Sequence, residues 1–263
     1  MSDAPNMFSD GKAYEKMMGR WSRIVGASFL DWLAPASGQR WLDSGCGNGA
    51  FTEEIIARTA PASVDAVDPS EGQIAFARTR PATQLAKFAI GDAQNLAFLD
   101  DSFDVAIMAL VIAFLPQPEK AAAEMRRVVR PGGLVATYMW DIEGTGTPLT
   151  PMADALTAMG LTPGVVPNPP ASGLEAMRGF WGGAGLLEVE TKVIGLTVRH
   201  ASLDEFWDSN FVAVGPMGAM FAKMGKDEQQ QLRARLAEQL PIASDGSIAY
   251  ERFVNAVKGK VPH

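Results

Sequence analysis

A glycine-rich turn near residue 45 constrains the fold of this chain more than any other feature. Segment 41–50 (WLDSGCGNGA) is a short apolar run followed by an acid and by glycine at every second position. Glycine adopts backbone conformations that other residues avoid, and it lets the backbone approach a ligand closely. The residues after the turn are patterned as a helix, whose first N–H groups lack partners within the helix. The segment therefore predicts a strand–turn–helix unit that binds a ligand at its turn.

The first 140 residues alternate between predicted strands and predicted helices. Strands are expected at 40–43, 64–68, 87–90, 103–110 and 134–140. Such alternation is typical of a parallel sheet with helices on both faces. Ligands of these sheets bind beyond the carboxyl ends of the strands. Four residues lie near predicted strand ends, namely Asp43, Asp68, Asp92 and Leu110.

The remainder of the chain breaks this alternation. Residues 141–173 contain six prolines and predict an insertion or lid; they are Pro148, Pro151, Pro163, Pro167, Pro169 and Pro170. Segments 186–193 and 196–200 are predicted as two strands that join the sheet as an antiparallel pair. Segment 251–260 fits either a helix or a final strand.

Composition limits the classes of protein to consider. The chain has 263 residues, one cysteine, two histidines and a net charge of −7. One cysteine leaves no internal disulfide and fits a reducing cytoplasm, and a metal site built from histidine or cysteine is not expected. The acidic balance argues against nucleic acid as a partner. No apolar run approaches the ~18 residues of a membrane span, and no secretory signal is expected at the N-terminus.

The acids around the predicted turn indicate what it binds. Asp43 would repel a pyrophosphate but would favour an ammonium or a sulfonium. Asp68, at the end of the second strand, is placed to accept hydrogen bonds from ribose hydroxyls. Asp92 can accept a hydrogen bond from an adenine amine. Together they describe S-adenosylmethionine, a nucleoside with a positively charged amino-acid tail and no phosphate.

Two alternatives remain open on these residues. With Ala50 in its last position, the turn also satisfies the relaxed dinucleotide pattern G-x-G-x-x-G/A. Asp68 would then bind the ribose of a nicotinamide cofactor, and the protein would be an oxidoreductase. The third reading is a cofactor-binding protein without transferase activity.

Four segments resemble the motifs of class I S-adenosylmethionine-dependent methyltransferases. LDSGCGNG at 42–49 is similar to their glycine motif, and VDPS at 67–70 resembles the second motif. GDAQNLAF at 91–98 with SFD at 102–104 resembles the third and fourth, and RVVRPGG at 127–133 resembles the segment before strand five. The order and spacing match over about residues 40–140. The resemblance is greatest to a subgroup that includes quinone-biosynthesis C-methyltransferases and many small-molecule methyltransferases.

The resemblance implies a doubly wound, Rossmann-like α/β fold. Its sheet would have seven mostly parallel strands with the last antiparallel, and helical lid segments would be added. We expect four parts: an N-terminal helical cap at 1–38, a cofactor-binding core at 39–140, a lid insertion at 141–173, and at 174–263 the completion of the sheet with a C-terminal helical cap.

The resemblance also implies which residues meet the cofactor. The methionine part would lie against the backbone of Gly45, Cys46 and Gly47. Asp68 would bind ribose, Pro69 and Ser70 would flank the adenine, Asp92 and Ala93 would lie at its edge, and Leu110 would give a backbone contact. From the helical pattern of 11–33, Tyr14 and Trp21 are further candidates to cover the ligand.

The methyl acceptor is expected to be a small, partly apolar metabolite. After the fourth strand many relatives carry histidines, whereas this chain has Val111, Ile112, Ala113 and Phe114. Histidine assistance is therefore not expected at this position. Candidate bases elsewhere are Asp141 and Glu143, just beyond strand five, and His200.

Overall fold

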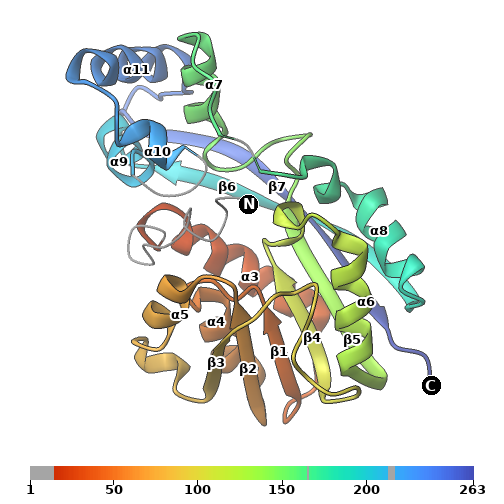
Figure 1. Ribbon diagram of the computed structural model, residues 1–263. Coiled ribbons are helices and arrows are strands. Elements are labelled where there is room, and N and C mark those ends of the chain that lie inside the picture. Colours follow the sequence, from red (N-terminus) through yellow and green to blue (C-terminus); the bar gives the residue numbers. More distant parts are fainter. Residues whose placement is uncertain (1–14, 165, 213–216) are drawn as a thin grey trace.

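A single mixed sheet organises the protein. The computed structural model describes residues 15–164, 166–212 and 217–263, and its strands are ordered β3-β2-β1-β4-β5-β7-β6 (Figure 1). The strands are β1 (Arg40–Ser44), β2 (Ser63–Asp68), β3 (Ala86–Ile90), β4 (Phe103–Ala109), β5 (Val129–Trp140), β6 (Leu187–His200) and β7 (Ile248–Lys260). β1 to β5 pair in parallel, and β7 runs antiparallel to both β5 and β6. The expected seven-stranded, mostly parallel fold is confirmed.

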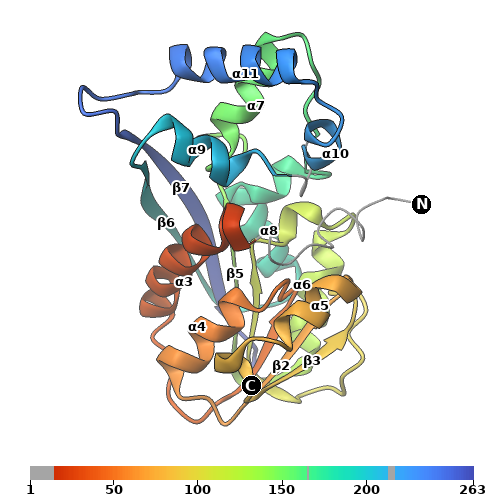
Figure 2. The same ribbon diagram turned by 90° about the vertical axis from the view of Figure 1, so that its left-hand side faces the viewer.

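Helices cover both faces of this sheet (Figures 1 and 2). On one side lie α3 (Arg20–Leu33), α4 (Ala50–Thr59) and α5 (Glu71–Ala77), and on the other lie α6 (Pro118–Val128) and α8 (Leu174–Gly183). The central strands are therefore apolar on both faces, as in β4, where residues 105–108 are fully buried. α3 continues a π-helical turn, η1 (Glu15–Gly19).

The two short strands predicted at 186–193 and 196–200 are wrong. The structure has one continuous strand, β6, and its antiparallel partner is β7. Ile194-Gly195 resembles a turn in the sequence. However, Gly195 faces Phe253 of β7, and a Cβ on this glycine would lie 3.3 Å from the Phe253 ring. The aromatic ring covers the gap that the glycine leaves, so the strand continues through it.

Four helices form a second apolar cluster, which we call the distal lobe. They are α7 (Thr150–Ala158), α9 (Leu203–Asn210), α10 (Gly218–Phe221) and α11 (Lys226–Gln239). Their buried residues include Leu156, Phe206, Phe221, Leu232 and Leu236. α9 directly follows β6, whose direction matches that of β5, so the lobe lies at the carboxyl end of the parallel strands (Figure 1).

No helix in the described part of the chain is long and apolar enough to cross a membrane. The division into four parts at residues 38, 140 and 173 stays a prediction.

Candidate cofactor site

The glycine loop joins β1 to α4 at the carboxyl edge of the sheet. Gly45, Gly47 and Gly49 all have positive φ, at +80°, +51° and +81°. A Cβ on Gly45 would lie 2.4 Å from Cγ2 of Val111, so this position packs too closely for any side chain. Among the described residues, a Cβ on Gly47 would meet no atom within 4 Å. The loop is therefore packed behind Gly45 and open in front of Gly47, as a surface that receives a ligand needs to be.

Asp68 ties this loop to the end of β2. Its carboxylate accepts one hydrogen bond from the N–H of Gly47 and one from the N–H of Ser70, both at 2.9 Å. Burial raises the pKa of Asp68, while these two hydrogen bonds lower it. The two bonds fix the carboxylate at the loop, where the sequence predicts ribose.

Asp43 is a buried acid beneath the loop. The hydroxyl of Thr52, in the first turn of α4, donates to Oδ2 of Asp43 at 2.6 Å. The other oxygen, Oδ1, is buried and has no hydrogen-bond partner among the described residues. Burial raises the pKa of Asp43 to about 7; the Thr52 bond lowers it and the charge of Asp68 raises it further. A buried carboxylate with one unsatisfied oxygen suits a cationic ligand and opposes a pyrophosphate.

Leu110 holds a backbone conformation that is rare for its residue type. Its φ is +60°, and its N–H donates to the carbonyl of Tyr138 at 2.8 Å. A non-glycine residue in this region costs about 1–2 kcal/mol, and such strain concentrates at functional sites. The turn at the end of β4 thus redirects the chain beside Val111, which covers Gly45.

The remaining predicted adenine contacts follow β2 and β3. Ser70 caps α5, since its hydroxyl accepts the N–H of Gln73. Asp92 is exposed and accepts the N–H of Gln94 at 2.8 Å, while Ala93 is buried. Pro69 is exposed beside the Asp68 carboxylate. These positions lie at adjacent strand ends, and their roles toward the cofactor stay predictions.

Tyr14 and Cys46 are two further residues that the sequence predicts to contact the cofactor. Tyr14 lies outside the described residues. Cys46 is buried in the loop, and burial with the nearby charges of Asp43 and Asp68 raises the pKa of its thiol. The thiolate form that a nucleophile requires is therefore disfavoured at Cys46.

The three candidate bases lie in three different environments. Asp141 accepts hydrogen bonds from Asn255 at 3.1 Å and from the N–H of Thr145 at 3.3 Å, which stabilise the turn after β5. Glu143 is exposed in the same turn. His200 is buried at the end of β6 against Trp21 and Phe206.

The environment of His200 keeps its imidazole neutral. Its Nδ1 lies 3.0 Å from Nη2 of Arg20, which can only donate, so Nδ1 accepts. Burial, together with the charge of Arg20, lowers the pKa of His200 to about 4. Nδ1 is thus already engaged by Arg20. No local sequence pattern predicts this contact, because it joins residues 180 positions apart.

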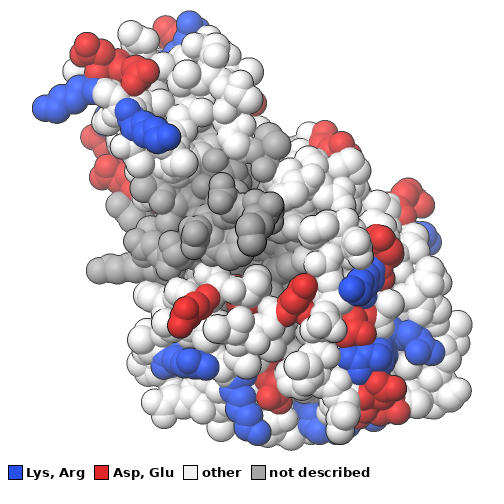
Figure 3. Space-filling view, viewed as in Figure 1, with Lys and Arg blue, Asp and Glu red and all other residues white. Residues whose placement is uncertain are grey.

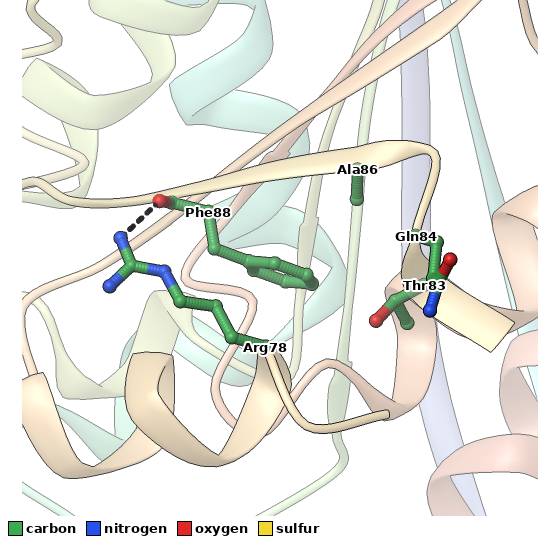
Figure 4. Close-up of a pocket in the computed structure, with 5 residues that line it drawn as sticks. All are labelled: Arg78, Thr83, Gln84, Ala86 and Phe88. Atoms are coloured by element: carbon green, nitrogen blue, oxygen red, sulfur yellow. Dashed lines mark hydrogen bonds between the residues drawn. The ribbon is translucent and has the colours of Figure 1, made fainter. Parts of the chain in front are cut away.

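A shallow pocket lies behind the glycine loop, at the edge of the sheet (Figure 4). It is lined by Arg78, Thr83, Gln84, Ala86 and Phe88. Arg78 donates from Nη2 to the carbonyl of Phe88 at 2.7 Å, so the guanidinium group in this pocket is already bound to the main chain. The Phe88 ring also supports the loop, since a Cβ on Gly49 would lie 3.4 Å from it. The pocket is a packing feature of the wall behind the loop.

Charges on the face seen in Figure 3 are mixed in sign. Acidic and basic side chains alternate over the described surface there, without a large patch of one sign. A nucleic-acid surface would need a basic stripe, which this face lacks among its described residues. Among those residues there is also no group of three acidic, histidine or cysteine side chains that could hold a metal ion.

The comparisons with known proteins agree with this geometry. Residues 42–137 match a family model described as a methyltransferase domain. The chain is 38% identical over 122 residues to the ubiquinone/menaquinone biosynthesis C-methyltransferase UbiE of Paracoccus denitrificans, covering 44% of this chain and 48% of that protein. It is 39% identical over 129 residues to the biotin biosynthesis bifunctional protein BioHC of Cellvibrio japonicus, covering 48% of this chain and 25% of that protein.

A solved structure extends the likeness to most of the fold. Phosphoethanolamine N-methyltransferase 2 of Haemonchus contortus, in complex with phosphomonomethylethanolamine and S-adenosylhomocysteine, superposes with a TM-score of 0.59 at 19% identity. The superposition covers 95% of this chain and 57% of that one. The chain thus spans half or less of the length of the two curated relatives, while its fold matches beyond the aligned sequence. Residues 42–137 therefore resemble a methyltransferase domain, and within this part the chain is similar to a quinone-biosynthesis C-methyltransferase.

Proposed function

We propose that this protein transfers a methyl group from S-adenosylmethionine to a small, partly apolar molecule. The observation that carries the proposal is the combination of an open glycine loop with the buried, incompletely bonded carboxylate of Asp43 and the loop-bound carboxylate of Asp68. When bound, S-adenosylmethionine supplies a methyl group on a positively charged sulfur. The likeness to methyltransferases supports the same assignment.

The chain would bind the cofactor through two acidic side chains and through the backbone of the glycine loop. Asp43 would favour the cationic amino-acid end through the negative charge of its ionised form. Asp68 would accept hydrogen bonds from ribose hydroxyls, and Gly45 and Gly47 would let the backbone reach the ligand. The enzyme's main task in such a displacement is to align the acceptor and to exclude water.

The acceptor would enter from the carboxyl edge of the sheet, between the loop and the distal lobe. The residues after β4, Val111 to Phe114, include the buried Ile112 and Ala113 and offer no ionisable group. A partly apolar acceptor fits this composition. Asp141, Glu143 and His200 remain the candidate bases, although His200 is already engaged by Arg20 and Asp141 by Asn255. We expect the reaction to take place in the cytoplasm, in keeping with the single buried cysteine.

Neither alternative has support in these observations. A nicotinamide cofactor would place a pyrophosphate at the loop, above the Asp43 carboxylate. A binding protein without transferase activity would share the site, so a turnover measurement separates it from an enzyme.

The proposal is tested first by calorimetric titration with S-adenosylmethionine and S-adenosylhomocysteine. Asp68→Ala should weaken both by more than about tenfold, the loss expected when hydrogen bonds to a charged group are removed. Asp65→Ala is the matched control, because Asp65 lies on the same strand three residues before that end. Transfer of labelled methyl to a panel of phenols, amines and activated carbon acids then tests turnover. Absence of binding to the wild type would refute the proposal.

A further inference from the structure

The side chain of Asn48 is the centre of a polar cluster behind the glycine loop. Asn48 lies between Gly47 and Gly49 and is 1% exposed. Its Oδ1 accepts the N–H of Ala50 at 3.1 Å, and its Nδ2 donates to Glu15 at 3.0 Å. Its carbonyl accepts a hydrogen bond from Nε of Arg80 at 2.7 Å. One loop residue is therefore held through both its side chain and its main chain.

Arg80 connects this residue to two acids. Nη1 of Arg80 donates to Glu53 of α4 at 2.8 Å, and Nη2 donates to Glu15. Three nitrogens of one planar guanidinium thus bind three different partners, a geometry that lysine cannot reproduce. The Arg80 side chain is only 12% exposed, so its contacts are weakly screened by solvent.

Glu15 connects the cluster to the N-terminal helix. It also pairs with Arg23 of α3. Burial raises the pKa of Glu15, but the two arginines outweigh this effect and the net pKa lies below its usual value. Glu15 is therefore ionised at neutral pH, and the two acids and two arginines of the cluster balance in charge.

Backbone bonds anchor the start of the loop, where two successive N–H groups donate to the carbonyl of Val67, and the polar cluster would add support to the residues that follow. Gly47 and Gly49 have no side chains and both adopt positive φ. The N–H of Gly47 nevertheless has to keep the orientation in which it donates to the Asp68 carboxylate at 2.9 Å. A binding group retains its geometry only when the residues behind it are themselves fixed.

We propose that Glu15 and Arg80 are positioning residues, which hold Asn48 and so fix the glycine loop in its cofactor-binding conformation. We call Glu15, Asn48 and Arg80 the loop latch. Glu15 belongs to η1, so the latch also makes the cofactor loop depend on the N-terminal helix. The effect on affinity rests on the proposed function, whereas the effect on the loop itself does not.

The test compares latch variants with a matched ion pair on α4, the helix that follows the glycine loop. Glu15→Gln and Arg80→Lys keep the size or charge of the side chain but break the latch. Glu54→Gln and Arg58→Lys are the controls, because Glu54 and Arg58 form a partly exposed ion pair at 2.8 Å on α4. The S-adenosylhomocysteine affinity, measured well below the melting temperature, should fall about tenfold or more in the latch variants. It should stay within about twofold of wild type in the controls.

Two further readouts separate positioning from general stability. Hydrogen exchange at the amides of residues 45–50 in the ligand-free protein should accelerate in the latch variants but not at the amides of β4. The double variant should lose less affinity than the sum of the two single losses, because both act through Asn48. Affinity and loop exchange equal to wild type in Glu15→Gln and Arg80→Lys would overturn the proposal. Failure of the wild type to bind would count against the proposed function alone, and loop exchange would still decide the latch.

Discussion

Two acids at the glycine loop differ in what surrounds them. Asp68 accepts two backbone N–H groups, whereas Asp43 is fully buried and accepts one hydroxyl. The free energy of ionisation is therefore less favourable for Asp43, whose pKa is raised to about 7. A cationic ligand would stabilise the ionised carboxylate, so binding of the ligand and loss of the proton from Asp43 would favour each other.

The affinity for S-adenosylmethionine should increase with pH in the neutral range. If only ionised Asp43 supports binding, the competent fraction rises about eightfold between pH 6 and pH 7.5, and the dissociation constant falls by that factor. Titration calorimetry across this range measures the change, and proton release follows from buffers of different ionisation enthalpy. The Asp43→Asn variant should bind weakly with little pH dependence. A wild-type affinity that does not change with pH would exclude this role of Asp43.

At the scale of elements, the N-terminal helix contacts both sides of the site. Glu15 reaches the glycine loop, and five residues later Arg20 reaches the junction of β6 and α9. There Arg20 pairs with Glu205 at 2.9 Å and donates to the carbonyl of Arg199 at 2.7 Å. Glu15 begins the π-helical turn η1 and Arg20 directly follows it, and π-helical turns often occur at functional sites. The pair with Glu205 is more than a third exposed on both sides and contributes at most about 1 kcal/mol.

His200 at this junction should make the fold sensitive to acid. Its pKa of about 4 in the folded state lies below the ordinary value near 6.5, so the unfolded chain binds a proton more readily between these values. The stabilising contribution of neutral His200 is present above about pH 6.5 and is lost as the pH falls toward 4. We expect the difference in unfolding free energy between wild type and His200→Gln to shrink by about 2 kcal/mol over this range.

Chemical denaturation of both proteins at several pH values measures this difference. The comparison with His200→Gln is needed because Asp43, whose folded pKa is raised, changes the stability in the opposite direction over the same range. An unfolding free-energy difference that is constant with pH would show that His200 titrates normally in the folded protein.

At the scale of the whole molecule, two apolar clusters meet at the carboxyl edge of the sheet. The larger cluster fills both faces of the sheet, and the smaller one forms the distal lobe. The long strands β6 and β7 join them, since β6 leads into α9 and α11 is followed by β7 (Figure 2). The arrangement suits a site whose cofactor side belongs to the sheet and whose acceptor side belongs to the lobe.

Ligand binding at this edge should stabilise the whole fold selectively. At a concentration of 100 times its dissociation constant, S-adenosylhomocysteine should add about 2.7 kcal/mol. For a chain of this size, that raises the melting temperature by roughly 5–10 °C. NAD at the same concentration should leave the melting temperature unchanged, and Asp68→Ala should lose most of the shift. Stabilisation by NAD and not by S-adenosylhomocysteine would favour the oxidoreductase alternative.

The sequence by itself determined the five parallel strands, the loop and the cofactor class. Local patterns are sufficient for these features, because the glycines, the strand ends and the Ser70 cap act within a few residues of one another. The acids after β1 and β2 could be predicted to meet because parallel strands end at one edge of the sheet.

Only the tertiary structure decided the contacts between distant segments. It made 187–200 one strand, because Phe253 of β7 covers Gly195, and it placed β7 between β5 and β6. It also brought Glu15 and Arg80 to Asn48 across 33 and 32 positions of sequence, and Arg20 to His200 across 180. No local pattern encodes such pairings, because their energy depends on burial and on the partner that the completed fold supplies. The glycine loop is thus a local feature of the sequence, while the side chains that support it are a product of the fold.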